Sequence, residues 1–232
     1  MTHILDRDIG RRALLGGAAA GGLLLLVPGC ATTGYGYSFD EAIRRLLLLS
    51  SERAFARLTA PGGYWDQQVA TMHFGAVFGT RGNVLASILT GPLFKSRLED
   101  AFADVAIRGT ARAAPIVADA VRVIGFSAAE ALVRGGPTAA TYFLREEMGG
   151  ALVEAMVPEL GQAIRVARDP VISDAITRLA GVDVAGVATR FSATINDAIW
   201  TEIGVEEAAI RRDPRATRDP LLIGVFGVAS RL

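Results

Sequence analysis

The sequence has few of the residues that supply catalytic and metal-binding chemistry. It contains one cysteine, Cys30, and two histidines, His3 and His73, among 232 residues. A single cysteine excludes an intramolecular disulfide. A domain that begins after Cys30 would hold no cysteine and one histidine, His73, so Cys/His metal sites, Cys/His dyads and zinc-protease motifs are excluded for that domain. With no G-x-S-x-G elbow and no phosphate-binding glycine motif present, we expect no metal and no cofactor.

Net charge and strand periodicity are also absent. The 24 basic residues balance 24 acidic ones, so no global field attracts nucleic acid or anionic lipid. No segment sustains the alternation of a half-buried strand, and no repeat of fixed period occurs. A content of 51% hydrophobic and 21% charged residues is typical of a globular domain. The sequence therefore predicts an all-α fold with a single compact multi-helix domain.

The N-terminal residues have the pattern expected of an export signal. Arg7, Arg11 and Arg12 precede an uncharged run over residues 13–27. This run is shorter than the roughly 20 apolar residues that cross a bilayer, so it reads as the apolar part of a signal peptide. The segment Val27-Pro28-Gly29-Cys30 resembles the lipobox of bacterial lipoproteins, although Pro28 departs from the usual residue there.

That resemblance implies a division of the chain and a location. Residues 1–29 would be the lipoprotein signal peptide, 30–38 a tether and 39–232 the helical domain, with Cys30 as the lipidated residue. Ala31 after the cysteine favours the outer membrane, so we expect an exported protein anchored at the periplasmic face. Arg11-Arg12 also resembles a twin-arginine signal, and the general export route stays open beside it.

Apolar residues at helical spacing predict most of the helices. The expected helices cover residues 39–58, 95–124, 128–134, 137–148, 151–158, 170–179 and 184–203, with a last turn or two from residue 220. Residues 64–90 predict short helices joined by glycine turns, with a small hairpin as the alternative.

Local signals mark the helix ends. Ser38 with Glu41, and Ser127 with Glu130, have the spacing of capping boxes. Pro115 is expected to kink or split the long helix over 95–124.

Glycine and proline mark the later boundaries. Gly135-Gly136 is expected to supply a left-handed turn, with Pro137 in the first turn of the next helix. Asp213-Pro214 should end a helix, and Asp219-Pro220 should cap and start the last one.

Two sequence blocks resemble a family of proteobacterial lipoproteins known as domain of unknown function four-one-nine-seven. The first block is Gly135-Gly136…Ala139-Ala140-Thr141-Tyr142-Phe143, and the second is Glu207…Ile210-Arg211…Pro214…Leu222…Val225-Phe226-Gly227. The resemblance implies export, lipidation and a helical domain, and no established reaction. Two departures are Ile107-Arg108-Gly109-Thr110-Ala111, which lacks the family's asparagine and glutamate, and Met148, which replaces a threonine.

Polar residues in and beside these blocks suggest a binding site. The candidate ligand-binding or partner-binding residues are Tyr142, Arg145, Glu207, Arg211, Arg215 and Arg218. Arginines beside a tyrosine can hold a phosphate or carboxylate. The structural alternative is that Arg145 and Arg211 pair with Glu146, Glu207 or Asp213 and fasten the C-terminal segment to the body. Thr138 and Thr141 are expected to be caps or helix contacts.

The function expected from these features is that of a lipid-anchored envelope protein. Its partners would be the membrane, through the lipid on Cys30, and an envelope protein or a small anionic or amphipathic ligand, with no nucleic acid. The alternative is an envelope hydrolase that uses a pair of acidic residues, as glycosidases do, and a purely structural protein is a third reading. No catalytic residue can be assigned, so enzymatic activity is not the expected function.

Overall fold

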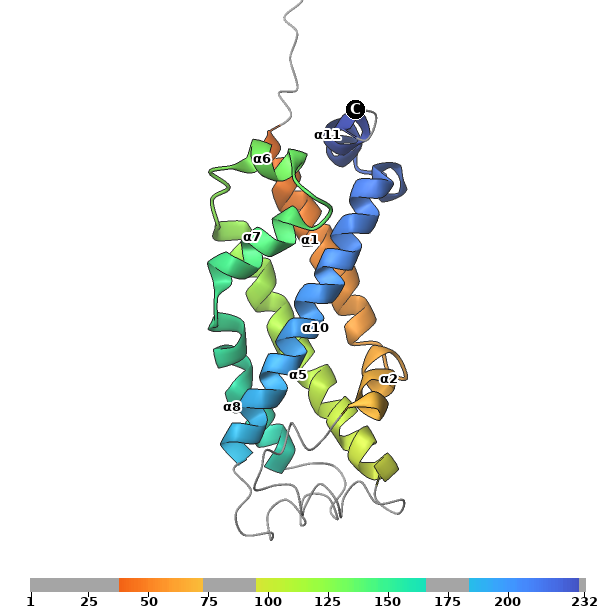
Figure 1. The fold of residues 1–232 in the computed structure, drawn as a ribbon, viewed down its shortest axis with the longest axis vertical. Coiled ribbons are helices and arrows are strands. Elements are labelled where there is room, and N and C mark those ends of the chain that lie inside the picture. Colours follow the sequence, from red (N-terminus) through yellow and green to blue (C-terminus); the bar gives the residue numbers. More distant parts are fainter. Residues whose placement is uncertain (1–37, 73–94, 166–183, 230–232) are drawn as a thin grey trace, which may run out of the picture. The chain divides into compact units, whose positions relative to one another are not determined.

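The computed structural model describes residues 38–72, 95–165 and 184–229. The chain divides into residues 1–36 and 37–232, and all of the described residues belong to the second unit (Figure 1). Its elements are α1 (Phe39–Leu58), α2 (Tyr64–Thr71), α5 (Lys95–Val123), α6 (Ala129–Arg134), α7 (Ala139–Met148), α8 (Ala151–Arg165), α10 (Val184–Arg212), the 3₁₀ helix η2 (Pro214–Thr217) and α11 (Pro220–Ala229). These residues contain no strand, and the expected all-α fold is confirmed. His73 and the helix expected over 170–179 lie outside them.

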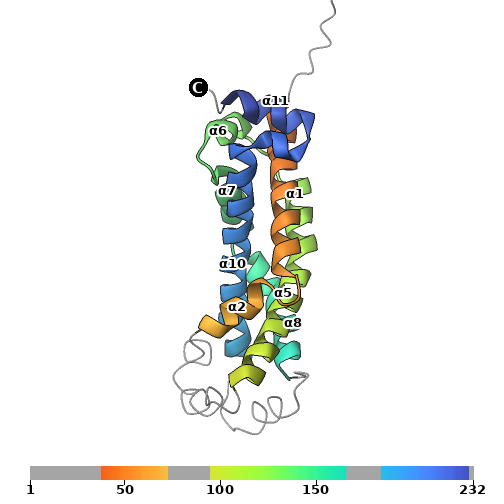
Figure 2. The same cartoon turned by 90° about the vertical axis from the view of Figure 1, so that its right-hand side faces the viewer.

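Four columns of helix surround one core. α1 packs on α5, α5 on α8, α8 on α10 and α10 on α1, which closes the bundle. α7 and α8 follow one another along one side, while α6, η2, α11 and the first turn of α1 form one end, which we call the α11 end (Figures 1 and 2). No helix in the described ranges is both long and apolar enough to cross a membrane.

Close packing in the middle of the bundle joins α5 to its neighbours. Phe102 and Phe191 meet edge to face with ring centroids 5.0 Å apart. A Cβ on Gly109 would lie 2.7 Å from Leu160 Cδ1, so glycine lets α8 approach α5. The buried Thr110 Oγ1 accepts a hydrogen bond of 3.1 Å from Trp65 Nε1. Two residues in the block that departs from the family pattern thus serve packing.

The start of α1 is fixed by its own cap and by arginine. The Ser38 half of the predicted capping box is confirmed, since Ser38 Oγ accepts from the Glu41 amide at 3.3 Å. The Glu41 carboxylate accepts from Arg45 at 2.9 Å. Arg44 donates to the carbonyls of Val121 and Arg122 at the end of α5 (2.6 Å to Arg122). A guanidinium at a helix C-terminus is favourable because the carbonyl ends carry partial negative charge.

Three predictions made from local signals differ from the structure in whole or in part. Ser127 caps nothing: α6 begins at Ala129 without a side-chain cap, and the backbone turn from Phe126 starts it instead. Of the kink or split predicted at Pro115, the split is wrong: α5 continues through Pro115, because Pro115 and Ala111, whose carbonyl loses the amide partner, are both exposed to water. α8 likewise continues through Pro158 to Arg165.

The turn between α6 and α7 also differs from the prediction. Gly135 has φ −69° and ψ 179°, so the turn is extended rather than left-handed. Glycine is needed for space: a Cβ on Gly135 would lie 2.6 Å from Ala139 Cβ. Pro137 precedes the cap residue Thr138 and lies outside the first turn of α7. The predicted break after Met148 is confirmed, with Gly149 at φ +50°.

The helix end predicted at Asp213-Pro214 is confirmed, although the helix expected over 184–203 does not stop at 203 and continues as α10. α10 ends at Arg212, and Asp219 Oδ1 accepts from the amides of Leu221 (2.8 Å) and Leu222 (3.2 Å) at the start of α11. Leu222, Val225 and Phe226 are buried against the body, and Arg45 donates to Asp219 at 2.9 Å. Arg218, between η2 and α11, has φ 57°, a left-handed conformation that costs an L-residue about 1–2 kcal/mol.

The Asp219 cap predicts a pH dependence of stability. Partial burial opposes ionisation of Asp219, but hydrogen bonds from Arg45 and from the amides of Leu222 and Leu221 outweigh it, so the pKa lies below its usual value. A lowered carboxyl pKa contributes stability above the unfolded-state pKa of about 3.9, and that stability is lost as the pH falls through the folded-state value. Asp219→Asn should therefore lower the free energy of unfolding at pH 7, with the difference from wild type shrinking towards pH 3. Urea unfolding of both proteins at several pH values measures this, and a pH-independent difference would contradict it.

Candidate functional site

A carboxylate from α10 caps the first turn of α7. Glu207 is fully buried. Its Oε1 accepts from the Ala140 amide at 3.1 Å, and its Oε2 accepts from the Thr141 amide at 2.7 Å and from Thr141 Oγ1 at 2.6 Å. Thr138, the residue in the cap position, makes no side-chain cap bond. Glu207 therefore performs the task of an N-cap from another helix, where its negative charge also suits the helix dipole.

Arg211, one turn further along α10, completes the same contact. Its Nε donates to Glu207 Oε1 at 2.7 Å, and the two side chains are 10% and 0% exposed. Its terminal nitrogens donate to the carbonyls of Val133 and Leu132 at the end of α6, each at 3.0 Å. The guanidinium also lies over the Phe226 ring of α11, 4.8 Å from the centroid.

This ion pair serves both helix ends at the break between α6 and α7. A helix start leaves amides without partners and a helix end leaves carbonyls, and burying either one unpaired is costly. The carboxylate takes the amides of α7, and the guanidinium takes the carbonyls of α6. Glu207 and Arg211 therefore form a structural lock, which is the alternative that the sequence offered for Arg211.

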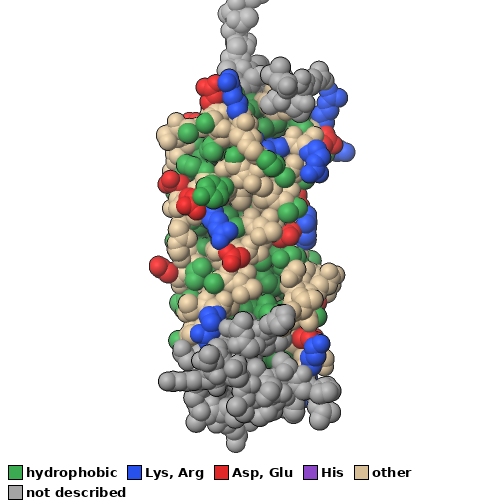
Figure 3. Space-filling model, viewed as in Figure 1, with side chains coloured by type: hydrophobic (Ala, Val, Ile, Leu, Met, Phe, Trp, Pro, Cys, Tyr) green, Lys and Arg blue, Asp and Glu red, His purple; other side chains and the backbone are tan. Residues whose placement is uncertain are grey.

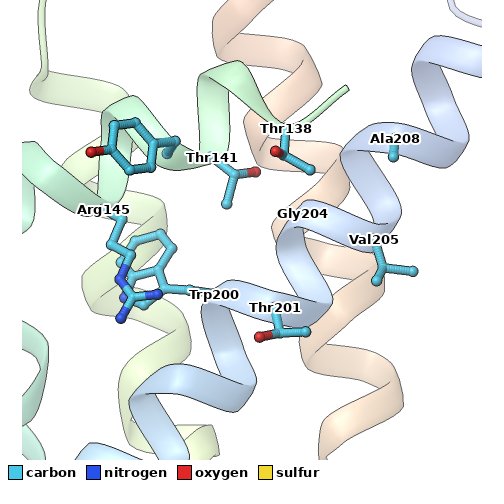
Figure 4. A pocket seen from close by; sticks show the side chains of 9 residues that line it. Thr138, Thr141, Arg145, Trp200, Thr201, Gly204, Val205 and Ala208 are labelled. Atoms are coloured by element: carbon cyan, nitrogen blue, oxygen red, sulfur yellow. The ribbon is translucent and has the colours of Figure 1, made fainter. Parts of the chain in front are cut away.

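A groove lies beside this lock, between α7 and α10. It has a volume of about 400 Å³ and is open to solvent. Its lining residues are Thr138, Thr141, Tyr142, Arg145, Trp200, Thr201, Gly204, Val205 and Ala208 (Figure 4). Tyr142 and Val205 are 65% and 46% exposed, and they count among the few large apolar residues exposed in the described ranges.

The polar groups of the groove are largely satisfied from within the protein. Thr141 Oγ1 donates to Glu207, and Thr201 Oγ1 donates to the Asp197 carbonyl at 2.8 Å. Arg145 donates to the Asp197 carboxylate at 2.6 Å, so the pairing predicted with Glu146, Glu207 or Asp213 is wrong. Both partners of this pair are exposed, at 43% and 64%. The groove therefore offers apolar surface with one accessible guanidinium at its edge.

The floor of the groove depends on a glycine. A Cβ on Gly204 would lie 3.2 Å from Thr138 Cγ2, so glycine permits the close approach of α10 to the start of α7. Trp200 is buried beneath the groove, with its Nε1 donating to Asn196 Oδ1 at 2.9 Å. The expectation that Thr138 and Thr141 are helix contacts is confirmed.

A second polar cluster lies between α1 and α10. Arg57 donates to Glu202 at 2.8 Å and to Glu206, and both glutamates are nearly buried. Burial and the negative charge of Glu202 raise the pKa of Tyr64 above its usual value. The two carboxylates converge on one guanidinium, as in a structural ion pair. Within the described ranges, no three His, Cys, Asp or Glu residues are placed to hold a metal ion.

The six residues proposed from sequence do not form one cleft. Tyr142 and Arg145 line the groove, whereas Glu207 and Arg211 belong to the buried lock. Arg215 and Arg218 are exposed in and after η2. Sequence reasoning missed Trp200 and Val205, which line the groove from α10, and Asp197, which pairs with Arg145 at its edge. Helical spacing places Asp197, Thr201, Val205 and Ala208 along one side of α10, but only the structure shows that α7 lies beside it.

Glu207→Gln tests the lock. The amide keeps the shape of the side chain but removes its charge, which leaves the nearly buried guanidinium without its counter-ion. We expect the free energy of unfolding to fall by about 3 kcal/mol, measured by urea unfolding followed by circular dichroism.

Glu130→Gln is the matched control. Glu130 and Arg134 form an i,i+4 pair of the same type, 60% and 76% exposed. Its loss should change the stability by at most about 0.5 kcal/mol. Equal effects of the two substitutions would show that the buried pair is no lock.

Comparison with known proteins places the chain in a family. No curated protein and no solved structure matches it. A family model described as "Protein of unknown function (DUF4197)" matches residues 36–227, which is most of the chain and includes every described helix, apart from the last two residues of α11. The lock joins the two sequence blocks that resembled this family, since Ala140 and Thr141 come from the first and Glu207 and Arg211 from the second. This chain belongs to the DUF4197 family.

Proposed function

We propose that this chain is a lipid-anchored envelope protein that binds a small amphipathic anion in the groove between α7 and α10. The anchor rests on the signal segment and Cys30. The observation that carries the binding function is the combination of exposed Tyr142 and Val205 with Arg145 in one groove. Exposed apolar side chains gathered around a concavity are typical of binding sites.

The groove suits a ligand with an apolar body and one acidic group. The apolar part would cover Tyr142 and Val205, where the neighbouring threonine hydroxyls already have partners. The acidic group would accept from Arg145, which offers more donors than Asp197 uses, since a guanidinium carries five N–H groups. Figure 3 shows basic and acidic side chains next to apolar ones on this face of the bundle.

The hydrolase alternative has less support. The groove lining contains no carboxylate. Glu202 and Glu206 converge, but Arg57 occupies both of them. A glycosidase needs two carboxyl groups facing a substrate, one of them ready to donate a proton. Binding without catalysis is therefore the function that the groove supports better.

Titration with dodecyl phosphate and with dodecanol tests the proposal. Trp200 lies under the groove and is one of two tryptophans, so its emission reports occupancy. We expect saturable binding of the phosphate, with the uncharged alcohol bound more weakly. Arg145→Gln should weaken phosphate binding by about tenfold, since a hydrogen bond to a charged group contributes about 1.5–3 kcal/mol before screening, and should leave alcohol binding unchanged.

Arg112→Gln, an exposed arginine on α5 away from the groove, is the control for the loss of charge. It should bind both probes as wild type does. The proposal fails if no saturable change in emission occurs, or if the two variants bind dodecyl phosphate alike.

A further inference from the structure

Three arginines beside α11 remain outside both the lock and the groove. Arg212, Arg215 and Arg218 are exposed, and they make no ion pair within the described part of the chain. Between residues 212 and 218 they stand against one acid, Asp213. The chain as a whole has no net charge, but this segment forms a local basic patch. Figure 3 shows basic side chains gathered at the α11 end, on the side where Figure 1 places η2 and α11.

The backbone gives a second sign that this patch has a use. Arg218 occupies a left-handed conformation at φ 57°. Glycine or asparagine adopts this conformation more easily than arginine does. Strained residues of this kind cluster at functional sites. A role for the Arg218 side chain would explain why an arginine stands here despite the free-energy cost of this backbone conformation.

The position of the patch relates it to the membrane. Seven residues, 31–37, separate Cys30 from Ser38 at the start of α1. A chain of this length reaches at most roughly 28 Å, whereas the 29 residues of α10 alone extend over roughly 44 Å. A lipid on Cys30 would therefore keep the α11 end nearer to the bilayer than the opposite end.

The structural links at this end hold the patch beside the start of α1. Arg45 of α1 binds Asp219, which caps α11 directly after Arg218. Phe39, the first residue of α1, is 39% exposed and lies at the same end. An anchored domain would thus present basic side chains together with an exposed aromatic ring near the headgroups, a combination that suits a bilayer interface.

We propose that the α11 end docks on an anionic phospholipid surface through Arg212, Arg215 and Arg218. This proposal rests on the lipid anchor of the proposed function and does not involve the groove. Each arginine near an anionic bilayer adds roughly fivefold to the binding constant. The three together would turn a loosely tethered domain into one held in a fixed orientation, with the groove on the side of an upright bundle.

Hydrogen exchange on vesicles tests the docking. The mature protein, purified from membranes of the cells that make it, is reconstituted in phosphatidylcholine vesicles with and without phosphatidylglycerol. We expect amides of residues 212–222 to exchange several-fold more slowly on the anionic vesicles, and amides of α8, at the other end, to exchange equally on both. Replacing Arg212, Arg215 and Arg218 by glutamine should abolish the difference.

The control variant replaces Arg97, Arg112 and Arg190 by glutamine, which removes the same charge elsewhere on the bundle and should keep the difference. Urea unfolding of both triple variants confirms that they fold. Equal exchange of residues 212–222 on the two vesicle types would overturn the proposal, and so would a slowing that survives loss of the three arginines.

The mass of the purified protein shows whether Cys30 carries a lipid, and so it tests the anchoring separately from the docking. If Cys30 carries no lipid, the proposed anchoring fails. The sole cysteine can then be coupled to a maleimide lipid in the same vesicles. Slower exchange of residues 212–222 on the anionic vesicles would then still support docking, and its absence would overturn it.

Discussion

The ion pair of Glu207 and Arg211 is the interaction on which the half of the bundle towards the α11 end depends. A break in one column of a helical bundle creates a helix end and a helix start, each with backbone groups that need partners. α10 supplies both partners from one turn of helix, with an anion for the amides of α7 and a cation for the carbonyls of α6. Because Arg211 also covers Phe226, the same turn holds α11 in place.

The groove is a consequence of this arrangement. Glu207 holds the first turn of α7 against α10, and Gly204 lets the two helices approach closely. Thr141 then points inward to the carboxylate, and the next residue, Tyr142, points out to solvent. The exposed tyrosine is therefore presented by a rigid element rather than by a loop, and a rigid binding surface loses little conformational entropy when a ligand binds.

The sequence was sufficient for features that depend on neighbouring residues. Periodicity placed α1 and α5 within one residue of their observed ends, and Ser38 and Asp219 cap the helices that directly follow them. Contacts between residues far apart in the sequence could not be predicted from it. Arg145 binds Asp197, 52 positions away, and Glu207 caps a helix 67 positions before it. The sequence alone favours a left-handed turn at Gly135. The actual reason for glycine, the lack of room for a Cβ beside Ala139, is visible only in the folded turn.

Native-state hydrogen exchange of the Ala140 and Thr141 amides tests the lock most directly. First-turn amides of a helix normally exchange readily because they have no helical partner. The lock predicts that these two amides exchange only by global unfolding, as those around Ile199 in the middle of α10 do, and far more slowly than Trp65 and Asp66 in the first turn of α2, which has no side-chain cap. Exchange of Ala140 and Thr141 as fast as that of Trp65 and Asp66 would contradict the account, because α7 would then open without breaking the bundle.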